Sequence, residues 1–160
     1  MRVEDAEPIS AAFERIGWHR PAESYLRYVA QAQAGDRVCV LAESGDEFAG
    51  YGTLLWRSNY PPFRRDRVPE INDLNVLPQY RRQGVGSALL DALEAAAGQR
   101  SKTVGLGVGL HAGYGAAQRL YVARGYRPDG RGVMYDDEPV EPGATIAIDN
   151  DATLMFTLSL

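Results

Sequence analysis

A short basic turn containing two glycines has the clearest chemical potential in the sequence. It follows an apolar, β-rich stretch and reads Arg81-Arg82-Gln83-Gly84-Val85-Gly86-Ser87 before a long helical pattern. The first N–H groups of a helix have no intrahelical acceptor and carry partial positive charge. Glycines let an anion approach those groups, and the arginines add positive charge. The turn predicts a phosphate or pyrophosphate site, and an ordinary strand–loop–helix joint with solvated arginines is the alternative.

Other phosphate-binding and catalytic motifs do not fit. A Rossmann fingerprint starting at Gly84 requires a small third residue, but Leu89 stands there. A second match, Gly107-x-Gly109-x-x-Ala112, lies within a strand pattern instead of after one. The sole lysine, Lys102, is not preceded by glycine, so there is no P-loop. No histidine or cysteine spacing suits a metal, and G-x-S-x-G is absent.

The elements that must position the turn follow from hydrophobic periodicity. Apolar residues at helical spacing predict helices, and β-rich runs bounded by turn residues predict strands. The expected helices cover 6–16, 21–35, 85–98 and 114–124, and the expected strands cover 38–41, 48–56, 71–77, 104–110, 132–135 and 154–158. Residues 57–69 are expected to form a loop. This order predicts an α/β fold, a mixed sheet with helices packed on its faces.

Composition limits the class of protein. The chain has 160 residues, of which 45% are apolar, and it contains no linker or repeat, so we expect a single domain over 1–160. No apolar run approaches the ~20 residues that span a bilayer, which argues against a membrane protein. The net charge of −4 disfavours nucleic-acid binding. A single cysteine, Cys39, is consistent with a reducing, cytoplasmic setting.

Two segments together resemble a known family. Arg81-x-x-Gly84-x-Gly86 matches motif A of the GNAT N-acetyltransferase superfamily, and Ala117-x-x-Leu120-Tyr121-x-x-x-Gly125-Tyr126 looks like its motif B. Both stand in the family's order and spacing, and the resemblance covers roughly residues 48–135. It implies a GNAT-like fold, in which the mixed sheet is splayed between its two central parallel strands and has helices on both faces.

The resemblance implies acetyl-CoA as co-substrate and no metal. The cofactor would lie between the strands at 71–77 and 104–110, with its pyrophosphate on the amides of 83–87 and its pantetheine arm paired with the backbone of Leu74 and Val76. The implied cofactor-binding residues are Leu74, Val76, Arg81, Arg82, Gln83, Gly84, Val85, Gly86, Ser87, His111, Tyr114, Ala117 and Tyr121. The glycines at 105, 107 and 109 either make room for the cofactor or allow tight helix-on-sheet packing.

The resemblance also assigns chemical roles. Tyr121 would protonate the leaving thiolate, and the N–H of Val76 would stabilise the oxyanion. A base must deprotonate the acceptor amine. Glu70 is the preferred base and Asp73 the second choice, and a solvated strand-end carboxylate is the alternative for either. Asn72 stands where other members carry the acid, and a bulge would change which face each side chain takes.

The resemblance implies direct acetyl transfer to a primary amine of a small molecule or peptide in a ternary complex. A CoA-binding sensor with little catalysis is the alternative. The loop holding Trp56, Tyr60 and Phe63 either walls the acceptor site or is merely pinned by these aromatic side chains. The resemblance to this family also suggests that the chain forms a homodimer. The chain departs from the family in having only about five residues before its first helix, where relatives usually have a strand.

Overall fold

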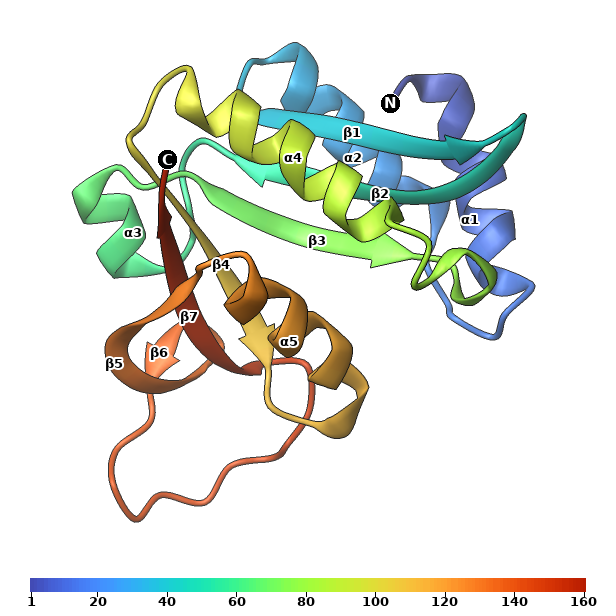
Figure 1. Cartoon of the computed structure of the whole chain (residues 1–160). Coiled ribbons are helices and arrows are strands. Elements are labelled where there is room, and N and C mark those ends of the chain that lie inside the picture. Colours follow the sequence, from blue (N-terminus) through green and yellow to red (C-terminus); the bar gives the residue numbers. More distant parts are fainter. The chain divides into compact units, whose positions relative to one another are not determined.

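A computed structural model describes all 160 residues, and it contains two compact units (Figure 1). Unit 1 comprises Met1–Leu55 and Asn72–Ala96, and unit 2 comprises Trp56–Ile71 and Ala97–Leu160. Strand β3 therefore begins in unit 2 and continues in unit 1. None of the helices combines the length and the apolar character that crossing a membrane requires.

Unit 1 is built from helices on a group of neighbouring strands. Its elements are η1 (Val3–Asp5), α1 (Ala6–Glu14), α2 (Ala22–Gln33), β1 (Arg37–Ser44), β2 (Glu47–Leu55), most of β3 (Glu70–Val76), η2 (Pro78–Tyr80) and most of α4 (Val85–Gly98). The β1–β2 pair is antiparallel and closes through the short turn at Gly45, as expected. No strand precedes η1 in the structure.

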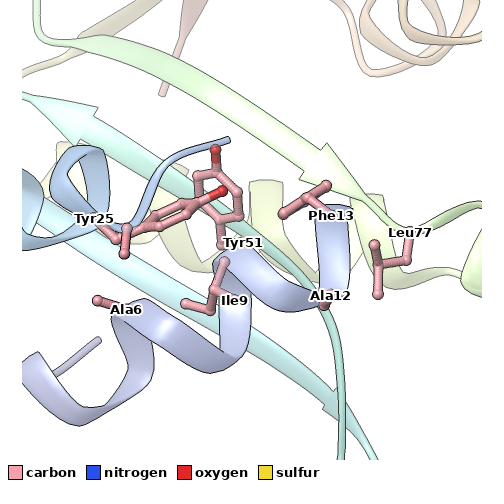
Figure 2. Close-up of a cluster of buried hydrophobic side chains, with 8 residues drawn as sticks. Ala6, Ile9, Ala12, Phe13, Tyr25, Tyr51 and Leu77 are labelled. Atoms are coloured by element: carbon pink, nitrogen blue, oxygen red, sulfur yellow. The ribbon is translucent and has the colours of Figure 1, made fainter. Parts of the chain in front are cut away.

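Helices cover both faces of the strands in unit 1. Tyr51 of β2 is fully buried in a cluster with Ile9 and Phe13 of α1 and Tyr25 of α2 (Figure 2). The next residue, Gly52, faces the other way, because successive side chains of a strand alternate. A Cβ at Gly52 would lie 2.8 Å from the Leu93 side chain of α4. The α1–α2 pair and α4 thus pack on opposite faces.

Unit 2 contains a four-stranded antiparallel group and two helices. Its elements are α3 (Pro61–Asp66), the first residues of β3, β4 (Thr103–Gly109), η3 (Ala112–Tyr114), α5 (Gly115–Ala123), β5 (Arg127–Tyr135), β6 (Glu138–Pro139) and β7 (Ala152–Ser159). β7 pairs antiparallel with both β4 and β5. A core of Tyr60, Phe63, Met134 and Met155 joins α3 to these strands.

Hydrogen bonding orders seven strands as β1-β2-β3-β4-β7-β5-β6. The β3–β4 pair is parallel, whereas the β1–β2, β4–β7, β5–β6 and β5–β7 pairs are antiparallel. The sheet is therefore mixed, which confirms the predicted α/β fold class. The pairing of β3 with β4 consists of Glu70 with Gly105 and Ile71 with Leu106.

The structure differs from the predicted elements in several places. The helix expected over 6–16 ends at Glu14, and β6 was not predicted. Residues 61–66 form α3, not loop, because proline is tolerated in the first turn of a helix, and Arg67 ends it in a left-handed conformation with φ 55°. The helix expected from Tyr114 begins at Gly115. β5 starts at Arg127, earlier than expected, and its register shifts between Pro128 and Val133, where Gly130 and Gly132 hide the alternation.

Candidate active-site residues

The predicted anion-binding turn in unit 1 has the geometry of an open helix N-terminus. The amide of Ala88 donates to the carbonyl of Gly84 at 2.9 Å, which makes Gly84 the N-cap of α4. The amides of 85–87 therefore precede the first helical hydrogen bond. Gly84 has φ +86°, and a Cβ built on it would meet no atom within 4 Å. The residues present fit a phosphate group, since the backbone is both accessible and rich in N–H donors.

The side chains of the turn mainly organise the turn itself. Arg81 Nε donates to the carbonyl oxygen of Val76 at 3.1 Å, and its guanidinium lies 5.3 Å from the ring centroid of Trp18. Gln83 Nε2 donates to the carbonyl of Gln79 at 2.7 Å. Arg82 is exposed and left-handed, with φ 59°. Arg81 thus ties the end of β3 to the turn that follows it.

The end of β3 presents the backbone groups that were expected to pair with pantetheine. The amide of Leu77 donates to the carbonyl of Ala49 in β2 at 2.9 Å. Because N–H and C=O directions alternate along a strand, Leu74 and Val76 direct theirs toward the opposite edge. The pairing of β3 with β4 ends at Ile71. Leu74 and Val76 lie beyond that point.

Asp73, the second candidate base, lies in unit 1 at the centre of a hydrogen-bonded cluster. Its Oδ1 accepts from Arg20 Nη1 at 2.8 Å and from Asn75 Nδ2 at 2.7 Å. Its Oδ2 accepts from the hydroxyls of Tyr51 at 2.6 Å and Tyr28 at 2.8 Å. Only 16% of the side chain is exposed.

These contacts decide the protonation state of Asp73. Burial alone would raise the pKa of Asp73, but the charge of Arg20 and the tyrosine hydroxyls outweigh it and lower the pKa. Burial and the Asp73 charge in turn raise the pKa of both Tyr28 and Tyr51, so these hydroxyls keep their protons. With two donors on each oxygen, Asp73 is a poor proton acceptor. Sequence reasoning missed this cluster because its residues are far apart in the chain.

Glu70, the preferred base, lies in unit 2 at the start of β3. It is buried, and Ser58 Oγ donates to its Oε2 at 2.5 Å. The amide of Tyr60 donates to Ser58 Oγ at 3.0 Å, and the Tyr60 hydroxyl donates to Asp129 Oδ2 at 2.8 Å. In this contact Glu70 accepts from a neutral hydroxyl.

Tyr121, the candidate acid, lies on α5 of unit 2 and is 6% exposed. Burial raises the pKa of Tyr121 to about 12, so the phenol keeps its proton near neutral pH. Its ring centroid lies 5.8 Å from that of Tyr126. Ala117, one helical turn earlier, is half-buried on the same helix.

His111 and Tyr114 are bound to another segment of unit 2. The Tyr114 hydroxyl donates to Asn150 Oδ1 at 3.0 Å, and His111 Nε2 lies 3.3 Å from the same oxygen. The amide of Gly113 donates to His111 Nδ1, which places the proton of the neutral ring on Nε2. Both side chains thus connect the start of α5 to the segment before β7.

The chain's own side chains fill the space beside the glycines of β4. A Cβ at Gly105 would lie 2.1 Å from the ring of Phe63, and one at Gly109 would lie 2.4 Å from the ring of Tyr114. A Cβ at Gly107 would lie 3.1 Å from Met155 Sδ. Packing within unit 2 explains these glycines, so room for a cofactor is not needed to account for them.

The aromatic segment before β3, which includes α3, is likewise held by internal contacts. Tyr60 and Phe63 are buried in the core, and Arg100 lies 4.2 Å from the ring centroid of Trp56. Arg64 Nε donates to the carbonyl of Ser58 at 3.0 Å. These contacts favour the interpretation that the aromatic side chains fix this segment by packing, over the one in which they wall the acceptor site. No group of three or more histidine, cysteine, aspartate or glutamate side chains is placed to hold a metal ion.

The mixed sheet and the helices on both faces define an α/β protein, and Gly84 caps an open helix N-terminus in it. The model of the acetyltransferase (GNAT) family matches residues 4–130, so the chain belongs to this family of acetyltransferases. No curated protein matches the sequence.

Solved structures agree with the fold. The ribosomal-protein-alanine N-acetyltransferase of Brucella melitensis is 16% identical, with a TM-score of 0.72 over 100% of this chain and 97% of the other. The yncA protein of Salmonella typhimurium, solved with its cofactor acetyl-CoA, is 16% identical, with a TM-score of 0.70 over 99% and 90%. An aminoglycoside 6'-N-acetyltransferase complexed with coenzyme A is 17% identical, with a TM-score of 0.66 over 96% and 89%.

Proposed function

We propose that this chain transfers the acetyl group of acetyl-CoA to a primary amine of a small molecule or peptide, directly and without a covalent enzyme intermediate. The observation that carries this proposal is the open N-terminus of α4, where Gly84 leaves the amides of 85–87 accessible. Similar structures hold CoA or acetyl-CoA. Acetyl-CoA supplies an activated thioester, and the protein supplies binding, orientation and proton transfer.

The backbone of unit 1 would hold the cofactor. The amides that begin α4 would bind the pyrophosphate, and Arg82 adds exposed positive charge beside them. The outward N–H and C=O groups of Leu74 and Val76 would pair with the amides of the pantetheine arm as a further strand does. The N–H of Val76 is the candidate donor to the oxygen of the thioester carbonyl as negative charge develops there.

Glu70 is the candidate base. A free alkylamine titrates near ~10.4, so near neutral pH it must lose a proton before its nitrogen has a lone pair. Glu70 would take that proton, directly or through a water molecule. Ser58 donates to Glu70 from a neutral hydroxyl. Asp73, the second candidate, is held by a guanidinium and three further donors, so it gains little by accepting a proton.

Tyr121 is the candidate donor to sulfur. The amine nitrogen forms a bond to the carbonyl carbon, the C–S bond breaks, and the electron pair leaves on sulfur. The Tyr121 hydroxyl, with a pKa of about 12, is protonated and would give its proton to the leaving sulfur. Glu70 would release to water the proton taken from the amine, and the Tyr121 phenolate would regain a proton from water, so the step is balanced.

Calorimetric titration with acetyl-CoA, CoA and ATP tests the cofactor site. We expect micromolar binding of acetyl-CoA and much weaker binding of ATP. A screen of amine acceptors that follows thiol release then tests transfer. Tyr121→Phe should lower turnover by about 10²-fold, the lower end of what a positioned acid contributes, at unchanged acetyl-CoA affinity. Equal turnover would remove Tyr121 as the donor, and binding without turnover on any amine would indicate a sensor.

A further inference from the structure

The cluster around Asp73 is not used by the proposed chemistry, although it adjoins the backbone assigned to the cofactor. Four donors converge on one carboxylate from four places in unit 1. Arg20 comes from the connector between α1 and α2, Tyr28 from α2, Tyr51 from β2 and Asn75 from β3 itself. Such convergence fixes the position of a side chain more firmly than a surface ion pair does.

The backbone at the same point departs from regular strand geometry. Asp73 has φ 56°, in the left-handed region that aspartate tolerates better than most residues. The carbonyl of the preceding residue, Asn72, accepts a hydrogen bond from the Thr53 hydroxyl at 2.6 Å. Arg37, which is buried, contacts the same hydroxyl and fixes it. Side chains thus hold the left-handed step at two points, the carbonyl of Asn72 before it and the carboxylate of Asp73 itself.

We propose that Asp73 is a positioning residue, whose four hydrogen bonds hold the left-handed step in β3 and so orient the backbone of Leu74 and Val76 toward the cofactor. The proposal rests on the acetyl-CoA site proposed above. Leu74 follows Asp73 directly, so a relaxation of Asp73 to extended geometry would rotate the peptide groups that follow it. Misplaced backbone groups of this kind weaken binding even though no contacting side chain has changed.

Acetyl-CoA affinity of matched variants tests the proposal. Tyr28→Phe removes one donor to Asp73, and Tyr25→Phe removes a nearby buried hydroxyl that is not among the donors to Asp73 (Figure 2 shows Tyr25 beside Tyr51). We expect Tyr28→Phe to weaken acetyl-CoA binding several-fold and Tyr25→Phe to leave it unchanged. Asp73→Ala, which loses all four hydrogen bonds, should weaken binding about tenfold or more, a loss of ~1.4 kcal/mol.

A glycine variant separates backbone conformation from the carboxylate. Asp73→Gly keeps the left-handed conformation accessible, whereas Asp73→Ala does not. We therefore expect Asp73→Gly to bind acetyl-CoA more tightly than Asp73→Ala, and both to bind less tightly than the wild type. The pH–rate profile of each should keep its shape, because a positioning residue takes no proton from the amine. All affinities are measured at a temperature where circular dichroism shows each variant folded.

The outcomes are distinguishable. If the wild type binds acetyl-CoA and both Tyr28→Phe and Asp73→Gly bind it equally well, the positioning role is refuted and the cofactor site stands. Lower melting temperatures at unchanged affinity would likewise assign the cluster to stability alone. Loss of the pH dependence of the rate in Asp73→Gly would make Asp73 the base. A folded wild type that binds no acetyl-CoA refutes the proposed function and this proposal with it.

Discussion

Replacing Gly105 by alanine tests whether the glycines of β4 serve packing or the cofactor. The added Cβ would lie 2.1, 2.4 and 2.8 Å from three ring carbons of Phe63. Carbon atoms in van der Waals contact are about 3.5–4.0 Å apart. The ring would therefore have to move by more than 1 Å, within a core where Tyr60, Met134 and Met155 surround it.

The cost follows from the burial of Phe63. A side chain added to a well-packed core typically costs about 1–3 kcal/mol. Since Phe63 is only 3% exposed and lies on the short helix α3, we expect the upper half of that range. For a chain of this size, ~2 kcal/mol lowers the melting temperature by roughly 4–8 °C.

Thermal and urea unfolding of four variants measure this cost. Gly105→Ala should be destabilised, whereas Gly98→Ala, whose Cβ would lie 3.8 Å from its nearest neighbour, is the matched control and should not be. Phe63→Leu should be destabilised by the loss of buried ring. The double variant Gly105→Ala with Phe63→Leu should be more stable than the sum of the single effects, by about 0.5–3 kcal/mol, because the smaller side chain makes room.

Two results would refute this reasoning. If Gly105→Ala unfolds at the wild-type temperature, the Phe63 ring does not occupy the space beside it. If stability is unchanged but acetyl-CoA affinity falls, the glycine makes room for the cofactor, as the other interpretation of this strand holds. A destabilised variant with wild-type affinity supports packing.

Three further predictions concern Gly84 in the turn before α4, the buried carboxylate of Asp73, and the Ser58 hydroxyl beside Glu70. Gly84→Val should weaken acetyl-CoA binding at least tenfold in calorimetry and Gly84→Asn less, because both meet the same φ of +86° but asparagine tolerates it; equal losses would place the effect in side-chain bulk alone. Asp73 has a lowered pKa when folded, so its contribution to stability is complete above the unfolded value of 3.8 and is lost as pH falls through the folded pKa. Urea unfolding should therefore show Asp73→Asn less stable than the wild type at pH 7 by about 1–3 kcal/mol, with a smaller loss on acidification below about pH 4; parallel pH dependences would contradict this. Ser58→Ala should lower turnover at unchanged acetyl-CoA affinity, because it removes a donor to Glu70. Wild-type turnover in this variant would show that the contact does not position Glu70.

The local order of elements was predictable because local signals agree with one another. Gly35 and Gly125, both left-handed, end α2 and α5 as their sequence positions indicate. Short elements were harder to predict. Pro61 and Pro62 open α3, but two prolines in succession are also typical of a loop, and only the burial of Phe63 decides between them. β6 has two residues and carries no periodicity.

The open turn before α4 was predictable because its residues are contiguous and backbone conformation alone defines it. The cluster around Asp73 was not, because Arg20 and Tyr51 lie 53 and 22 residues from their partner. The left-handed step at Asp73 also had no sequence signal, since no glycine marks it. Its existence alters the simple alternation on which the assignment of faces to the β3 side chains depended.

The distinction between Glu70 and Asp73 shows what the structure adds, because the sequence presents two carboxylates three residues apart on one strand. A base must accept a proton in each turnover, and a carboxylate that already accepts four hydrogen bonds and faces a guanidinium gains little by doing so. Glu70→Gln should therefore lower turnover at neutral pH by about 10²-fold or more while acetyl-CoA affinity is retained. Without a base the rate should depend on the fraction of free amine, so activity should rise with pH toward the amine pKa of ~10.4. If the rate and its pH profile match those of the wild type, neither Glu70 nor its contact with Ser58 takes part in proton removal, and the amine loses its proton to water.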